Sequence, residues 1–237
     1  MTEARYELLR TLRAPAFAGP FLLIPTALYL LFGTMIPESG SVRPPGPYLF
    51  TAFTVMGIMG PALFGFGMGL ALEREQGLIA LKRALPMPKG AYLVAKMLMA
   101  ASFAVLIATA IALETLLVGR APVTMGQAVG VALIGVVGTI PFCAIGLFIG
   151  ARVSGRAAPA FVNLAYLPLM YLSGLFFPLP QSIRWVALFS PAFHLNQLAL
   201  HATGTPSILG PAINIAALVG VTVLFTGLTA RRLSRGM

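Results

Sequence analysis

The chain has 237 residues, 58% of them hydrophobic and only 9% charged, and its mean hydropathy is +0.92. Soluble domains carry about a quarter charged residues, so this composition excludes a soluble fold and indicates an integral membrane protein. The net charge of +10 does not indicate nucleic-acid binding, because the basic residues cluster at the ends of apolar runs, as the positive-inside rule produces. The single cysteine, Cys143, excludes a disulfide framework and a cysteine metal site.

Residues 2–16 predict an amphipathic helix that lies on the inner membrane surface. Leu8, Leu9 and Leu12 share one helical face, and most of the charged side chains share the other, where the arginines can lie among anionic headgroups. A frayed basic tail is the alternative. The apolar run that follows is long enough to remain in the membrane, so we expect no cleavable signal peptide.

Six apolar runs are long enough to cross the membrane, which takes about 20 apolar residues in a helix. The prediction is therefore an all-α membrane protein with one transmembrane domain over residues 1–237. Prolines within or near these runs predict bends, because neighbouring helices can satisfy the freed carbonyl groups. The predicted spans are Phe17–Ile36, Tyr48–Leu72, Tyr92–Val118, Met125–Gly150, Ala157–Phe177 and Ile208–Thr229.

The charges in the loops predict that both ends of the chain lie in the cytoplasm. In that orientation 13 of the 16 basic residues fall on the inner side, and only Arg43, Arg120 and Arg184 fall on the outer side. The loop after the second span and the short turn at 151–157 are then cytoplasmic. We expect a multi-pass protein of a bacterial or archaeal cytoplasmic membrane.

Residues 73–89, between the second and third spans, predict a short cytoplasmic amphipathic helix. Leu78, Leu81 and Leu85 share one of its faces. Two acidic residues lie at its predicted start and two basic residues lie in its last turn, and the helix dipole favours both placements. Two prolines then end the helix. These six residues are Glu73, Glu75, Lys82, Arg83, Pro86 and Pro88. The alternative is a solvated loop that anchors its neighbours by charge.

Residues 178–203, on the predicted outer side, are strongly apolar but interrupted by prolines. The pieces between the prolines, at 182–189 and 192–201, are about 12–15 Å long as helices and cannot cross a core of about 30 Å. We therefore expect two short helices in a re-entrant hairpin that protein buries, with Trp185 near the outer interface. A flat interfacial segment is the alternative.

Polar residues inside the spans are candidates for a translocation path. Asn163 and Tyr166 share a face of the fifth span, as do Tyr166 and Met170, although the polar side chains could equally bond neighbouring helices. Glu114 is the one carboxylate inside an apolar run, near the outer end of the third span. It is either functional or reaches the interface and Arg120.

Two further patterns predict packing. His194 and His201 have no third ligand nearby, so polar contacts that close the hairpin are expected in place of a metal site. The glycines between Met56 and Gly69 predict a close approach of helices, either at a dimer seam or within the subunit.

The whole chain resembles the ABC-2 family of ABC transporter permeases. The sequence E-R-E-x-G-x-x-x-L-x-x-x-x-P at residues 73–86 resembles the coupling helix of that family. The sequence SGLFFPLP at residues 173–180, with the later Trp, Ser-Pro and His, resembles its outer hairpin. The chain departs from many relatives in one respect, because its first outer loop, residues 37–47, is too short for a large outer domain.

The resemblance implies a homodimer of six-span subunits, with one ATPase subunit docked beneath each. The residues expected to contact the ATPase are Glu73, Arg74, Glu75, Gly77, Leu78, Leu81 and Arg83. The residues that match the outer hairpin are Phe177, Pro178, Trp185, Pro191 and His194.

The chain has no Gly-x-x-x-x-Gly-Lys-Ser/Thr phosphate loop, so we expect no enzyme activity and no cofactor in this chain, with ATP and magnesium on the partner subunit. The expected function is ATP-driven export of an amphipathic or hydrophobic small molecule or lipid, with membrane lipids and no nucleic acid as further partners. The alternatives are a glycan or glycolipid substrate, or a stand-alone channel or carrier. A carrier would normally need ionisable residues at mid-membrane, and the spans have almost none.

Overall fold

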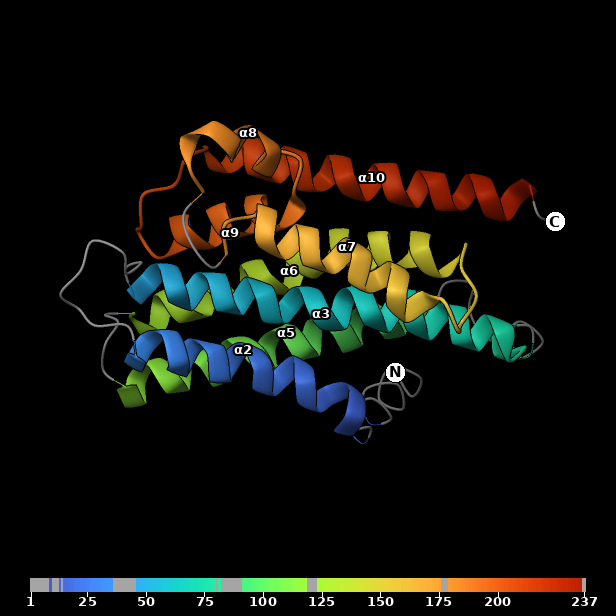
Figure 1. The fold of residues 1–237 in the computed structure, drawn as a ribbon, viewed down its shortest axis with the longest axis horizontal. Helices are drawn as coiled ribbons and strands as arrows, with labels where there is room; N and C mark the ends of the chain where they lie inside the picture. The colour runs from blue at the N-terminus through green and yellow to red at the C-terminus, as the bar shows by residue number, and fades with distance from the viewer. Residues whose placement is uncertain are drawn as a thin grey trace.

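The computed structural model describes Leu9, Arg13 and residues 15–35, 46–79, 81, 91–118, 123–175 and 179–235. These residues form a bundle whose long helices run along one axis (Figure 1). Within the predicted N-terminal helix, residues 2–16, the structure describes Leu9 and Arg13, joined by a hydrogen bond from the Arg13 amide to the Leu9 carbonyl oxygen, and the last two residues, which begin the first helix of the bundle. The helices are α2 (Pro15–Met35), α3 (Gly46–Glu75), α5 (Ala91–Val118), α6 (Met125–Gly150), α7 (Ala158–Leu172), the 3-10 helix η1 (Gln181–Ile183), α8 (Arg184–Ala187), α9 (Pro191–Ala202) and α10 (Pro211–Arg235).

Four of these helices are long and apolar enough to cross a membrane, namely α3, α5, α6 and α10. The described apolar parts of α2 and α7 are shorter, at Ala18–Gly33 and Ala158–Leu172. The predicted span 157–177 was too long, because α7 ends at Leu172 and Gly174 then adopts a φ of +73°. A residue in this left-handed conformation ends a helix, and glycine adopts it without steric cost.

Helix α3 forms the centre of the bundle and packs against α2, α5, α6, α7 and α9. Its apolar residues surround the helix on all sides, as expected of a buried helix. The backbones of α3 and α6 approach closely, because a Cβ atom added to Gly150 would lie 2.5 Å from the carbonyl oxygen of Gly67, and one added to Gly146 would lie 2.7 Å from that of Leu63. The glycines predicted to let helices approach do so here within the subunit, where Gly67 faces α6 and α7.

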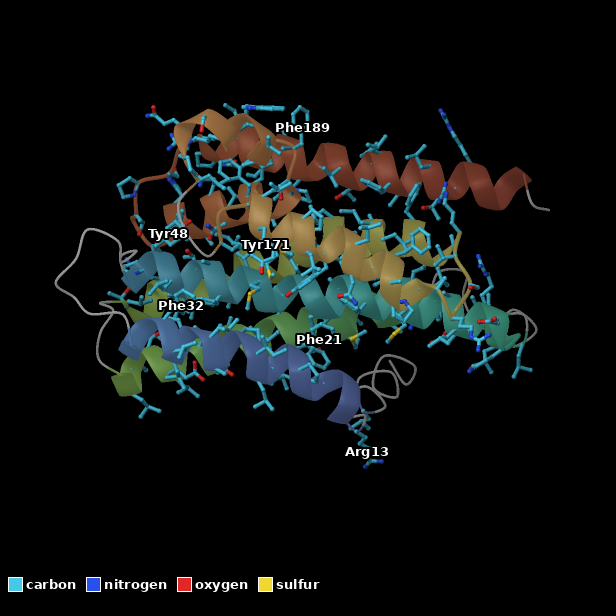
Figure 2. All side chains as sticks on the ribbon, viewed as in Figure 1. Arg13, Phe21, Phe32, Tyr48, Tyr171 and Phe189 are labelled. Carbon is cyan, nitrogen blue, oxygen red and sulfur yellow. The ribbon has the colours of Figure 1, made fainter. Side chains whose placement is uncertain are left out.

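Aromatic rings hold α2 against α3. Figure 2 shows Phe21 and Phe32 between the two helices, where their ring centroids lie 5.2 Å from Phe64 and 5.5 Å from Phe53. Tyr29, on the same helix, shares a buried hydrogen bond of 2.7 Å with the hydroxyl of Thr115 on α5. These contacts fix the first helix of the bundle against both of its neighbours.

The two ends of the bundle carry different groups of residues. At one end, called here the Glu73 end, lie the last turn of α3, the first turns of α5, the turn at 151–157 and the last turns of α10 (Figure 1). At the other, the His194 end, lie α8, α9 and the start of α10. There Gln127, in the first turn of α6, donates a hydrogen bond of 2.8 Å to the carbonyl oxygen of Thr203 after α9.

Candidate functional site

A buried ion pair closes the loop that connects α3 to α5. The Nζ atom of Lys96 lies 3.1 Å from Oε1 of Glu73, and the two side chains are only 2% and 1% exposed. Nζ also lies 5.2 Å from the ring centroid of Tyr92, one turn earlier on α5. Because Glu73 is in the last turn of α3 and Lys96 in the second turn of α5, the pair clamps both ends of the candidate coupling segment together.

The predicted start of the coupling helix was wrong. Residues Glu73–Glu75 are the last turn of α3, which continues three residues beyond its predicted end. The change of direction comes at Gly77, where φ is +72°, and a new helical turn follows, with the amide of Leu81 donating to the carbonyl oxygen of Gly77 at 3.1 Å. A carboxylate at a helix C-terminus is disfavoured by the helix dipole, and Lys96 offsets that cost for Glu73.

Arg74 fastens the last turn of α3 to the turn between α6 and α7. Its two terminal nitrogens donate to the carbonyl oxygens of Ala151 and Val153, the latter at 2.7 Å. Gly155 lies directly against α3, since a Cβ atom there would be 2.4 Å from Oε2 of Glu75. The structure therefore joins two segments that the sequence separates by about 80 residues into one surface.

The predicted coupling residues divide into a buried anchor and an exposed edge. Glu73 lies inside the bundle, so it is not part of an accessible surface in this chain. Glu75 and Gly77 are exposed, Leu78 is half-buried, and Leu81 is 60% exposed. Arg83 lies outside the described residues. The exposed edge thus offers the carboxylate of Glu75, the turn at Gly77 and the apolar side chain of Leu81. Such a mixture of charged and apolar groups suits a contact with another protein.

At the opposite end, His194 joins α9 to α10. Its Nδ1 lies 2.8 Å from Oδ1 of Asn214, and its Nε2 lies 2.9 Å from the carbonyl oxygen of Leu188. The side-chain nitrogen of Asn214, Nδ2, donates to the carbonyl oxygens of Leu209 and Gly210, both at 3.1 Å. His194 therefore makes polar contacts to α10 and to the segment before α9.

The other hairpin residues have varied surroundings. Pro191 begins α9 and is buried together with the six residues after it. Trp185 is exposed on α8. Phe189, after the end of α8, is also exposed, and Figure 2 shows it on the outside of the bundle. His201 is exposed on the last turn of α9. Phe177 and Pro178 lie outside the described residues.

The candidate path residues do not lie together. Tyr166 points toward α3, where its hydroxyl donates to the carbonyl oxygen of Met56 at 3.3 Å and its ring packs on Phe64, and Met170 is also buried. Asn163, expected on the same face, is exposed, because it lies at the edge of α7 that turns away from α3. Glu114 lies just before the last turn of α5, near the His194 end, whereas Asn163 is near the Glu73 end.

Sequence reasoning missed the roles of Lys96 and Arg152, which it counted only as cytoplasmic charges. A lysine within an apolar helix and an acidic residue at the end of the preceding helix are a signal for such a pair. Glu114, by contrast, has one buried carboxylate oxygen without a hydrogen-bond partner in the described structure.

The described residues include four long apolar helices, one of which is the buried central helix α3, and this is the fold of a multi-pass membrane protein. The chain matches the family model described as ABC-2 type transporter over residues 2–203. It therefore belongs to the ABC-2 family, whose members are transmembrane permease subunits that are not themselves catalytic and that normally work with an ABC ATPase subunit. It is similar to "Putative transport permease YvfS" of Bacillus subtilis (strain 168), with 27% identity over 228 residues that cover 92% of this chain and 90% of that protein.

Proposed function

We propose that this chain is the permease subunit of an ATP-driven exporter, in which an ATPase subunit docks at the Glu73 end of each of two copies of the chain. The observation that carries this proposal is the form of the segment after α3. Its base is fixed by the buried Glu73–Lys96 pair and by Arg74, while Glu75, Gly77 and Leu81 remain exposed. Because the base is fixed, a displacement of the exposed edge also displaces α3 and α5.

We propose an amphipathic or hydrophobic small molecule or a lipid as the substrate. An apolar groove between α5 and α6 supports this choice, because alanines on both helices leave room between them. It is lined by Ala108, Thr109, Ala112, Leu113, Thr115, Leu116, Val123, Thr124, Met125, Ala128, Val129 and Ala132. Apolar walls with few polar groups suit an apolar ligand better than a glycan, whose hydroxyl groups would need hydrogen-bond partners.

ATP hydrolysis tests the proposal. The purified chain alone is expected to hydrolyse no ATP, and the complex with its ATPase subunit in nanodiscs is expected to do so. Lipids and hydrophobic drugs are expected to stimulate this activity more than oligosaccharides do. Stimulation by oligosaccharides alone would replace the substrate assignment by a glycan or glycolipid. Transport by the chain without any ATPase would instead favour the stand-alone channel or carrier.

The orientation is tested by two single cysteines in a Cys143→Ser background. Gln181 is exposed at the start of η1, and Gln181→Cys is expected to react with a membrane-impermeant thiol reagent in intact cells. Gly90→Cys, in the loop between α3 and α5, is expected to react only after permeabilisation. The reverse pattern would place the Glu73 end outside the cell and remove any contact with a cytoplasmic ATPase.

A further inference from the structure

Helix α10 is the least covered of the long helices. Only 17% of its apolar window is buried, compared with 78% for α3, and it packs chiefly on α6 and α9. Polar contacts hold it near each end. At the His194 end the contact is Asn214 with His194, and at the Glu73 end it is Leu228 with Arg152.

Arg152 lies in the turn after α6 and bridges two helices. Its Nη1 donates to the carbonyl oxygen of Phe148 on α6, and its Nη2 donates to that of Leu228 on α10, both at 3.0 Å. The guanidinium also lies 3.6 Å from the ring centroid of Phe148, and that ring makes an edge contact with Phe225 of α10. The planar fork of arginine suits this double contact, which a lysine could make only in part.

The two residues on either side of Arg152 accept hydrogen bonds from the side chain of Arg74. Since Ala151 and Val153 accept its two hydrogen bonds, three consecutive residues connect the last turn of α3 to α10. Their three backbone amides all donate to carbonyl oxygens at the end of α6, those of Leu147 and Ile149, so the segment is held as one turn. A displacement of Arg74 therefore shifts the backbone that carries Arg152.

We infer that Arg74 and Arg152 form a positioning relay that carries a displacement of the segment after α3 to the end of α10. Neither arginine contacts substrate in this arrangement. Arg74 grips the turn at 151–153, and Arg152 passes the movement on to Leu228. The role as part of a transport cycle rests on the proposed function, but the mechanical connection belongs to this chain alone and can be measured without an ATPase.

The first test is hydrogen–deuterium exchange of the full chain in nanodiscs, followed in peptides that cover residues 225–235. Arg152→Ala is expected to speed exchange there at least about tenfold, as loss of a charge-assisted hydrogen bond predicts. Arg74→Ala is expected to do the same, although Arg74 does not contact Leu228. Arg152→Lys is expected to give an intermediate rate.

The control is Arg156→Ala, which removes the same charge from an exposed position in the same turn. It is expected to leave exchange in residues 225–235 unchanged. If Arg152→Ala speeds exchange in α10 but Arg74→Ala does not, Arg152 is only a local anchor and the relay is refuted. Equal effects of Arg74→Ala on α10 and on α2 would also refute it, because they would indicate general loosening of the fold.

The second test uses the complex with its ATPase subunit and a spin label at Ala230→Cys in a Cys143→Ser background. Addition of ATP and vanadate is expected to change the label's mobility in the otherwise unchanged chain and with Arg156→Ala, but not with Arg152→Ala. A nucleotide-dependent change that persists with Arg152→Ala would overturn the relay. Failure of an ATPase to bind at all would contradict the proposed function, and the exchange experiment would still decide whether α3 and α10 are connected.

Discussion

Replacing Glu73 by Leu is expected to cost about 3–5 kcal/mol of stability, because it leaves the ammonium group of Lys96 buried without its counter-charge. Lys96→Met is expected to cost a similar amount, because it removes the positive charge that the buried carboxylate of Glu73 faces. The double variant, Glu73→Leu with Lys96→Met, is expected to recover most of the loss, since a well-packed apolar pair avoids the desolvation of both charges. Thermal unfolding in detergent, followed by a fluorescent probe of Cys143, measures the three effects.

Glu75→Leu is the control for this series, because it removes an acidic residue from the same helical turn at an exposed position. Its effect on unfolding is expected to be small. Additive losses in the double variant would show that Glu73 and Lys96 do not interact, and would contradict the clamp. If the double variant regains stability but not ATPase coupling, the two charges have a role in transport that is separate from their role in folding.

Gly77→Pro is expected to abolish ATPase coupling while the protein still inserts into the membrane. Proline holds φ near −65°, whereas Gly77 has a φ of +72°, and proline also lacks the N–H that Gly77 donates to the carbonyl oxygen of Arg74 at 3.2 Å. The turn that aims Leu81 outward cannot then form. Substrate-stimulated ATP hydrolysis and transport by the reconstituted complex measure the loss.

The chain offers a matched control in Gly204. Its φ is +71°, and its amide donates to the carbonyl oxygen of His201 at 3.1 Å, so Gly204→Pro imposes the same local strain at the His194 end. Gly77→Asn is a second comparison, since asparagine tolerates the left-handed conformation better than most residues and is expected to keep much of the activity. If both proline variants lose coupling equally, the effect is one of general strain and the segment after α3 has no special part in it.

The sequence predicted helix positions well where polar residues flank an apolar run. Helix α6 has the predicted bounds, Met125–Gly150, because Thr124 caps its start and a polar turn follows its end. The end of α7 was missed, because the apolar residues continue past Gly174 and only the backbone conformation marks the stop. The family was recognised from the order of such elements, which the match over residues 2–203 confirms.

The site was harder to predict than the helices. The partner of Glu73 is 23 residues away, and the pairing depends on how α3 and α5 are rotated about their axes, which periodicity does not determine. The separation of Asn163 from Tyr166 has the same cause, because two residues at i, i+3 can lie on either side of the boundary of a packed face. The bonds from Arg74 to backbone carbonyls leave no trace in the sequence at all, since any residue at 151 or 153 supplies the same acceptor.

The glycine contact between α3 and α6 limits how this sequence can change over evolutionary time. At Gly146 and Gly150 even one methyl group would meet backbone atoms of α3, which cannot move aside as a flexible side chain can. Along α10, in contrast, Gly220 and Gly227 have no atom within 4 Å of an added Cβ, and many neighbouring positions are exposed. Substitutions among apolar residues can therefore accumulate on α10 while Gly146 and Gly150 stay fixed. We therefore expect relatives to share the centre of the bundle and to differ more along α10.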